Sequence, residues 1–228
     1  MPTPDEALLF YLPAAFDLGA VFFFALTGAL VAIRRGYDLI GLFAMSFISG
    51  LGGGLIRDGL FLQDGPPALT RDWRYLAAVA AGCFVGWIMG SLLERFRRLV
   101  AILDAVGLGA YSIVGVSRSL GVGLSIPAAI LVGVINACGG SLLRDVVVRE
   151  EPIIMKPGQL YVVASFVACA TFVVLTLRSG LGAQQSAAVS IAAGFLVRML
   201  AIFFDWRTRA VRPWWDDAFG IGGDAGKE

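Results

Sequence analysis

Seven long apolar runs, separated by short polar segments, make up most of the sequence. Each run has about 20 residues, the number that an α-helix needs to cross the roughly 30 Å hydrocarbon core of a bilayer. The pattern therefore predicts an all-α membrane protein in which residues 1–228 form one transmembrane domain, without a separate soluble domain. The predicted spans are approximately Pro13–Ile33, Leu39–Leu62, Trp73–Leu93, Leu99–Leu120, Ile126–Val148, Leu160–Leu177 and Gln184–Phe204.

One short motif occurs twice, near the end of the second run and near the end of the fifth. The string GGGLIRD at residues 52–58 returns 87 positions later as GGSLLRD at residues 139–145, and the same offset aligns Asp17 with Asp104. We interpret the chain as two copies of a three-span unit. Because three is odd, the second copy enters the membrane from the opposite side, which makes an inverted-topology repeat. The predicted parts are repeat 1 at 13–98, repeat 2 at 99–179, a seventh span at 180–206 and a cytoplasmic tail at 207–228.

The amino-acid composition supports a membrane protein and argues against several other classes of protein. Hydrophobic residues make up 58% of the chain and charged residues 15%, against about 25% charged residues in an ordinary soluble domain. The net charge of +1 gives no sign of a nucleic-acid partner, and the absence of His excludes histidine catalysis and histidine metal sites. Three scattered Cys residues in apolar runs indicate packing rather than a metal site or a disulfide framework. We therefore expect no enzyme activity, no metal and no cofactor.

The loop charges predict an orientation, because Lys and Arg accumulate on the cytoplasmic side. With the N-terminus outside, the inside segments hold ten basic residues and the outside segments hold four. We therefore expect the N-terminus outside and the C-terminus in the cytoplasm. The inside residues are Arg34, Arg35, Arg95, Arg97, Arg98, Arg149, Lys156, Arg207, Arg209 and Arg212, and the outside residues are Arg71, Arg74, Arg118 and Arg178.

Small residues stand in succession within both motif-bearing spans. A glycine in a helix interior costs about 1 kcal/mol relative to alanine. Such residues permit close packing of membrane helices, or they mark broken helices that line a polar pathway. The symmetric recurrence and the Arg-Asp pair that follows favour the pathway, so we expect helix breaks near mid-bilayer. The residues concerned are Gly52, Gly53 and Gly54 in the first copy and Gly139, Gly140 and Ser141 in the second.

Each copy also places a carboxylate and a guanidinium at a similar depth. Asp17 and Arg57 both lie toward the outer side, and Asp104 and Arg144 toward the inner side. Charges within a membrane usually face the bundle interior and pair, so we expect these two pairs. Asp58 and Asp145 adjoin the arginines in sequence and are expected to point elsewhere, either into the pathway or toward the headgroups. Arg198, within the seventh span, either snorkels to the interface or projects inward.

This combination of features resembles the prokaryotic branch of the trimeric intracellular cation channels, and the same repeat is also named the glycine-transporter domain. The resemblance covers about Pro13–Leu177. It implies homotrimers in the bacterial inner membrane, surrounded by membrane lipid, with a separate pore in each protomer lined by the second and fifth helices. It also implies conduction of monovalent cations, potassium above all. The basic motif of animal members is absent here, where Ser49-Gly50-Leu51 precede Gly52.

Two functions from different classes fit the sequence. One is a passive cation channel, and the other is an alternating-access transporter of a small zwitterion such as glycine. Inverted repeats and broken helices suit both, and an arginine beside an aspartate also suits a carboxylate and an ammonium group. A structural or assembly role is disfavoured by the intramembrane charges. For an intramembrane enzyme the sequence offers no catalytic constellation.

Overall fold

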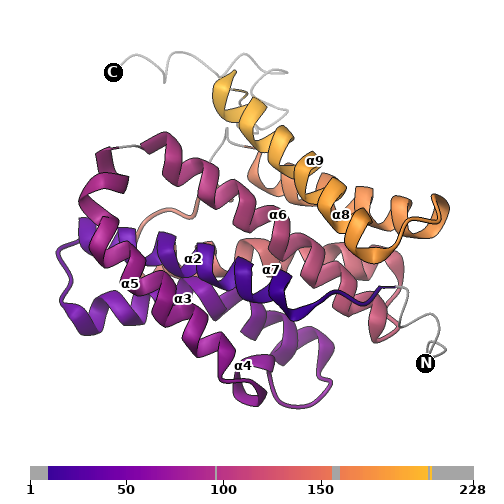
Figure 1. Ribbon diagram of the computed structural model, residues 1–228, viewed down its shortest axis with the longest axis horizontal. Coiled ribbons are helices and arrows are strands. Elements are labelled where there is room, and N and C mark those ends of the chain that lie inside the picture. The colour runs from indigo at the N-terminus through magenta and orange to yellow at the C-terminus, as the bar shows by residue number, and fades with distance from the viewer. Residues whose placement is uncertain (1–9, 96, 156–159, 205, 207–228) are drawn as a thin grey trace, which may run out of the picture.

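The computed structural model describes residues 10–95, 97–155, 160–204 and 206, apart from the side chains of residues 91–100. This part of the chain consists of helices and their connecting turns (Figure 1). The helices are α2 Ala14–Arg34, α3 Leu39–Ile56, η1 Arg57–Leu62, α4 Ala68–Arg71, α5 Arg74–Arg95, α6 Arg97–Gly121, α7 Ile126–Val147, α8 Tyr161–Arg178 and α9 Ala183–Phe203.

The observed helices agree with the predicted spans to within two residues at each end, if η1 is counted with α3. Six of them are long and apolar enough to cross a membrane, and the described part of α5 adds a shorter apolar helix, Arg74–Gly90. The protein is therefore an all-helical, multi-pass membrane protein, and the count of seven spans, which requires α5 to cross the membrane as well, remains a prediction. The predicted cytoplasmic tail, 207–228, lies outside the described residues.

Helices α2 and α6, the first of each predicted copy, lie at the centre of the bundle (Figure 1). Helix α2 packs against α3, α5 and α6, while α6 packs against α7, α8 and α9. Helices α3 and α7, which carry the two motifs, pack directly against each other. Phe24 of α2 stacks on Tyr111 of α6, with ring centroids 5.2 Å apart. These two residues are related by the 87-residue offset.

The predicted helix breaks are wrong. Helix α3 runs as a regular α-helix through Gly52–Gly54, and α7 does the same through Gly139–Ser141. The alternative interpretation, close packing of two helices, accounts for the motifs instead. An i→i−4 hydrogen bond does not need a side chain, so consecutive glycines weaken a helix without interrupting it.

The space around the glycines shows that they allow α3 and α7 to approach each other closely. A Cβ atom on Gly53 would lie well under 3.0 Å from the carbonyl oxygen of Asn136, and one on Gly140 would meet that of Ser49 equally closely. Ser49 and Asn136 are themselves 87 positions apart. The crossing of α3 and α7 is therefore a reciprocal contact, in which a glycine of each helix admits the backbone of the other.

Helix α3 does become irregular, but after the motif rather than within it. Bonding of the π type starts at Arg57 and continues to Leu62, and Gln63 ends the helix in the left-handed conformation with φ of 48°. Helix α7 remains α-helical to Val147. π-Helical turns are uncommon in proteins, and those that occur are often at functional sites, so this segment is a candidate part of the functional site.

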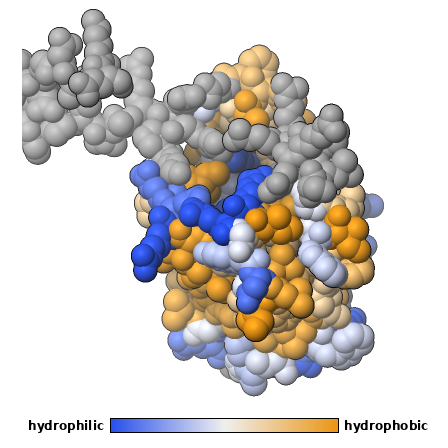
Figure 2. Space-filling model, turned by 90° about the vertical axis from the view of Figure 1, so that its left-hand side faces the viewer, coloured by the Kyte–Doolittle hydropathy of each residue, from blue (hydrophilic) through white to orange (hydrophobic). Residues whose placement is uncertain are grey.

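Large apolar side chains remain exposed on the outer helices, as expected where lipid covers the protein. On α5 they include Phe84, Trp87 and Ile88, and on α8 Val162 and Phe166. Figure 2 shows the end of the bundle that lies at the left of Figure 1, where hydrophilic residues gather among hydrophobic ones. The bundle thus presents an apolar flank and a more polar end.

Candidate functional site

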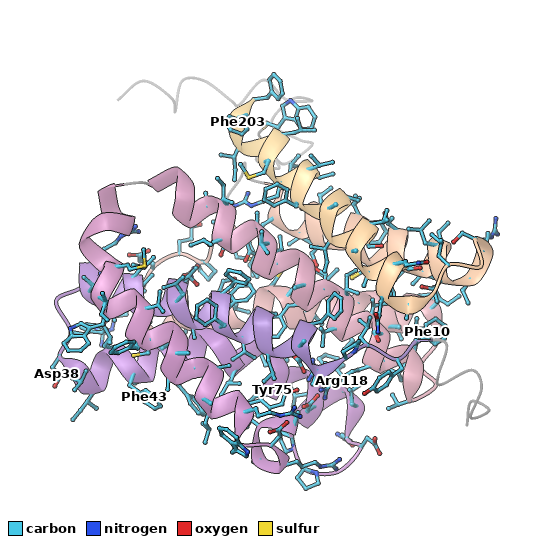
Figure 3. The ribbon with its side chains drawn as sticks, viewed as in Figure 1. Phe10, Asp38, Phe43, Tyr75, Arg118 and Phe203 are labelled. Atoms are coloured by element: carbon cyan, nitrogen blue, oxygen red, sulfur yellow. The ribbon has the colours of Figure 1, made fainter. Side chains whose placement is uncertain are left out.

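Three polar side chains from three helices meet in one cluster, in which two of them donate hydrogen bonds to the carboxylate of the third. Asp17 of α2 accepts hydrogen bonds at Oδ2 from the Tyr75 hydroxyl of α5 at 2.6 Å and from Arg118 Nη2 of α6 at 2.8 Å. Arg118 Nη2 also donates to the Tyr75 hydroxyl oxygen at 2.9 Å, and Figure 3 shows these two residues side by side. Asp17 is 3% exposed and Tyr75 5%. We call these residues the Asp17 triad.

Arg57 lies buried next to the Asp17 triad. Its Nε donates to Asp58 Oδ1 at 2.7 Å, and its Nη2 lies 3.8 Å from Asp17 Oδ2. Asp58 Oδ2 accepts a hydrogen bond from the backbone N–H of Ala68 at 3.0 Å and lies 3.9 Å from Arg118 Nη1. Two carboxylates and two guanidinium groups thus form one connected cluster whose charges balance. Within the described residues, Arg57 Nη1 has no hydrogen-bond partner.

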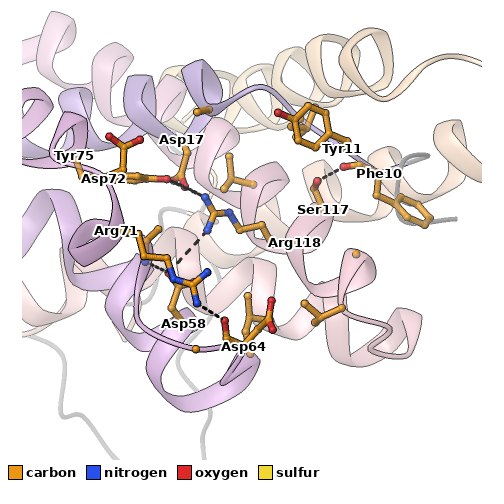
Figure 4. A pocket seen from close by; sticks show the side chains of 18 of the residues that line it. Phe10, Tyr11, Asp17, Asp58, Asp64, Arg71, Asp72, Tyr75, Ser117 and Arg118 are labelled. Atoms are coloured by element: carbon orange, nitrogen blue, oxygen red, sulfur yellow. Dashed lines mark hydrogen bonds and ion pairs between the residues drawn. The ribbon is translucent and has the colours of Figure 1, made fainter. Parts of the chain in front are cut away.

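A cavity of about 530 Å³ opens beside this cluster, and we call it the vestibule (Figure 4). Arg118 extends across it, with Asp17 and Tyr75 on one side and Asp58 on the other. A second cavity of about 10 Å³, room for roughly one water molecule, follows along Arg57. The vestibule therefore leads from the surface to the buried charges and narrows there. Its rim includes Phe10, Tyr11, Asp64, Arg71, Asp72 and Ser117.

The rim of the vestibule is negatively charged in part. Arg74 beside Asp72 holds the pKa of that carboxyl below its ordinary value, because Arg74 Nε donates to it at 2.7 Å. Asp72 therefore stays ionised at pH values where an unpaired aspartate would take up a proton. Arg71 is directed along the rim, where its Nη2 donates to the backbone carbonyl of Asp64 at 2.8 Å. The described residues contain no group of three or more side chains suited to hold a metal ion.

The second copy carries a related cluster at the other end of the bundle. Arg144 donates to Asp145 Oδ1 through both Nε and Nη2 at 3.0 Å. Asp145 Oδ2 accepts from the backbone N–H of Ile153 at 3.1 Å, as Asp58 does from Ala68. The charge of Asp104 is acted on by the positive charges of Arg144 and Arg198. The two Arg-Asp pairs therefore have the same local geometry.

The predicted charge pairs are found in part. Asp17 and Arg57 are brought within 3.8 Å, although Tyr75 and Arg118 are nearer to Asp17. In the second copy, no ion pair between Asp104 and Arg144 is present among the described residues, because Arg144 turns to Asp145 instead.

The expectation that Asp58 and Asp145 point away from the arginines is wrong, although Asp58 does line the vestibule. Each carboxylate pairs with the arginine directly before it in sequence. Neighbouring Cα–Cβ bonds diverge on a helix, but an arginine side chain is long enough to fold back across the turn. Each Asp then uses its second oxygen to bind the backbone N–H that follows in the next segment.

Sequence analysis missed Tyr75 and Arg118 as site residues. The sequence interpretation counts Arg118 only among the basic residues of the outside side, whereas its side chain, in the last turn of α6, is directed to Asp17. A signal was present: Asp17 begins the first apolar run and Arg118 ends the fourth, so antiparallel packing of these runs brings the two charges together. No periodicity identifies which runs are neighbours, and the contact therefore could not be assigned.

The fold and these clusters define a multi-pass helical membrane protein that buries an Arg-Asp pair in each half. The sequence matches the glycine transporter family at residues 14–91 and again at residues 101–177. The chain therefore belongs to this family and carries its unit twice. The resemblance to the prokaryotic trimeric intracellular cation channels, inferred from the motif, is confirmed by structural similarity.

Three relatives illustrate the similarity. The UPF0126 membrane protein of Deinococcus radiodurans is 33% identical over 150 residues, which are 65% of this chain and 69% of that protein. The UPF0126 inner membrane protein YadS of Escherichia coli strain K12 is 25% identical over 187 residues, 82% of this chain and 89% of the relative. The structure of the trimeric intracellular cation channel orthologue from Rhodobacter sphaeroides has 31% identity and a TM-score of 0.75, and it covers 83% of this chain and 96% of its own.

Proposed function

We propose that the protein is a cation channel of the bacterial inner membrane that conducts monovalent ions, potassium above all. In this proposal it forms a homotrimer, as the name of the Rhodobacter sphaeroides protein states for that relative, and each protomer has its own pore. The observation that carries the proposal is the vestibule. It leads from the surface to the charge cluster of Asp17, Arg57, Asp58 and Arg118, between the two halves of the chain.

We infer seven spans, arranged as two inverted three-helix repeats followed by α9. Symmetry-related contacts support this arrangement, because a two-fold axis in the membrane plane makes a contact between the halves either join equivalent residues or occur a second time with the two residues exchanged. Such an axis passes close to the crossing of α3 and α7, and we place the pore beside that crossing. The supporting contacts are Phe24 with Tyr111, Gly53 with Asn136 and Gly140 with Ser49.

The gate in this proposal has two parts, which correspond to the two copies of the motif. One part closes the ion path at the vestibule end and consists of the charge pairs around Asp17, Arg57 and Asp58. The other part closes the opposite end of the path and consists of the charge pairs around Asp104, Arg144 and Asp145. Opening draws the arginines off the carboxylates, which then face the path and attract cations. Separation of α3 and α7 at Gly52–Gly54 and Gly139–Ser141, where the two helices pack most closely, opens the path beside the crossing.

A planar lipid bilayer with unequal KCl concentrations on its two sides tests the proposal. Purified protein should give unitary current steps that reverse near the equilibrium potential of K⁺. Asp58→Asn, in the charge cluster, should lower the unitary current more than Asp72→Asn at the rim, where Arg74 already balances the carboxylate. Reversal near the Cl⁻ potential would reject cation selectivity.

A transporter of a small zwitterion is the second candidate. The vestibule offers a guanidinium group at Arg118 and a carboxylate at Asp58, which together suit the carboxylate and the ammonium group of glycine. The family's description as a glycine transporter agrees with this option. Glycine uptake into proteoliposomes, in the absence of unitary currents, would favour the transporter over the channel.

A further inference from the structure

The second copy contains a counterpart of the Asp17 triad that lacks one member. Asp104 corresponds to Asp17, and Tyr161 begins α8 much as Tyr75 begins α5. Both tyrosines are buried, with exposed fractions of 3% and 5%. The position equivalent to Arg118, however, is Val31, which carries no charge. The equivalent position in the first copy therefore supplies no arginine to Asp104.

The packing of α2 on α6 shows that Val31 is also the equivalent position in space. Asp17 contacts Arg118, and seven residues further along α2 Phe24 stacks on Tyr111, seven residues earlier in α6. The two helices are therefore antiparallel and keep one register over about two turns. The next step of seven residues brings Val31 opposite Asp104. By this register, the position opposite Asp104 holds an apolar residue where the position opposite Asp17 holds an arginine.

Helix α9, outside both copies, brings an arginine to this region. Its buried face consists of small residues together with Arg198, which is 3% exposed. Gly194 allows α9 to approach α8 closely, since a Cβ there would lie 2.8 Å from Cβ of Ala168 and 3.1 Å from the carbonyl oxygen of Ala164. One turn further along α9, the guanidinium of Arg198 covers the ring of Tyr161, 4.9 Å from its centroid.

The other nearby arginine is already engaged. Arg144 and Arg198 both lie within electrostatic range of Asp104, and Arg144 is held by Asp145 at 3.0 Å. We infer that Arg198 is the counter-charge of Asp104, a positioning residue through which α9 completes the half of the site opposite the vestibule. It does for Asp104 what Arg118 does for Asp17. Only its effect on conduction rests on the proposed function; the charge pairing stands independently.

A double-mutant cycle in detergent-solubilised full-length protein tests the pairing. Arg198→Met and Asp104→Asn should each lower the midpoint of thermal unfolding, whereas the double variant should recover at least half of the loss caused by Arg198→Met alone. Arg198→Lys should keep most of the parent's midpoint. Arg178→Met, at an exposed arginine that ends α8, is the matched control and should change nothing. Losses that simply add in the double variant overturn the pairing.

Transplanting the arginine tests the same inference if Arg198→Met folds poorly. Val31→Arg places a guanidinium opposite Asp104 by the register of α2 and α6. It should restore the folded yield and the unfolding midpoint in the Arg198→Met background, but not when Asp104→Asn is also present. If Arg198 only packs on the Tyr161 ring, the effect of Val31→Arg will not depend on residue 104, and that result overturns the inference.

Single-channel current recordings distinguish a failure of the proposed charge pairing from a failure of the proposed channel function. In Arg198→Met, Asp104 lacks its counter-charge and should bind cations more tightly. Tight binding slows the exit of an ion from the pore. The current through this variant should therefore saturate at a KCl concentration about threefold or more below that of the parent protein. Arg198→Lys should saturate as the parent does. Unchanged saturation in Arg198→Met overturns the positioning role. If the parent protein gives no unitary currents, the channel hypothesis is rejected. The double-mutant cycle then still tests whether Asp104 and Arg198 pair.

Discussion

Asp17, Arg57, Asp58 and Arg118 place two negative and two positive charges in one cluster at the floor of the vestibule. Burial of charges is unfavourable unless each is paired and hydrogen-bonded. Here Asp17 has three donors or cations around it, and Asp58 has two cations and a backbone N–H. The cluster is therefore stable only as a unit, and removal of one member leaves its partners without compensation.

Asp17→Asn tests this dependence on the whole cluster. The change keeps the side-chain volume and the hydrogen bond from Tyr75, but it removes the charge that Arg118 and Arg57 share. Because Arg57 retains Asp58, we expect a loss of about 3 kcal/mol in the free energy of unfolding, the lower end for a broken buried pair. Unfolding by denaturant in mixed micelles measures the difference.

Asp72→Asn is the matched control for that measurement. Asp72 pairs with Arg74 at the exposed rim, and exposed ion pairs contribute little to stability because water screens them. If Asp17→Asn is no less stable than Asp72→Asn, the buried cluster is not the unit described above.

The residue scale also shows how far the sequence could be interpreted. The repeated Arg-Asp string and the depth of Asp17 were sufficient to place Asp17 near Arg57. The contact of Asp17 with Arg118 depends on which helices are neighbours, and the pairing of Arg57 with Asp58 depends on the rotamer of a long side chain. Neither property is encoded in spacing along the chain.

At the scale of elements, the crossing of α3 and α7 determines how the two halves fit. The apolar runs were sufficient to predict the helices, because length and hydropathy alone limit a span. The function of the glycines could not be decided in the same way. A run of glycine is equally expected where a helix breaks and where another backbone approaches, and only the position of the facing helix distinguishes the two.

Gly53→Ala should destabilise the protein. The added methyl group meets the carbonyl oxygen of Asn136 in a contact between two backbones, which cannot move aside easily. Overpacking of this kind costs about 1–3 kcal/mol, and Gly140→Ala should behave in the same way against Ser49. Thermal unfolding of the purified variants gives the comparison.

Gly19→Ala provides the control within a helix. Nothing lies within 4 Å of a Cβ atom at Gly19 in α2, so the variant should gain up to about 1 kcal/mol from helix propensity. Equal unfolding midpoints for Gly53→Ala and Gly19→Ala would mean that the crossing of α3 and α7 is not tight.

At the scale of the whole molecule, orientation decides which side of the membrane the vestibule faces. The vestibule lies at the end that holds Gln63 and Asp64, while Tyr37 and Arg35 lie at the opposite end, where Arg35 pairs with Glu150. The basic count predicts that this opposite end faces the cytoplasm. The vestibule would then open to the outside, which makes external cations the ones that reach it first.

Labelling with a membrane-impermeant thiol reagent tests this orientation in intact cells. The three native cysteines are buried, which keeps the background low. Gln63→Cys should be labelled from outside, and Tyr37→Cys should be labelled only after the cells are opened. A reporter fused after Lys227 should be cytoplasmic. The reverse pattern would invert the whole arrangement.

The distance along the chain between Asp17 and Arg118 has a consequence for the order in which the protein is made. The two residues are 101 positions apart, so at about 5–20 residues per second a ribosome needs roughly 5–20 s to reach the arginine after it has added the aspartate. Helix α2 thus leaves the ribosome with a carboxylate whose main counter-charge does not yet exist. The first half of the protein is therefore made before Asp17 has its hydrogen-bonded counter-charge, and the Asp17 triad can form only after the second half has been inserted.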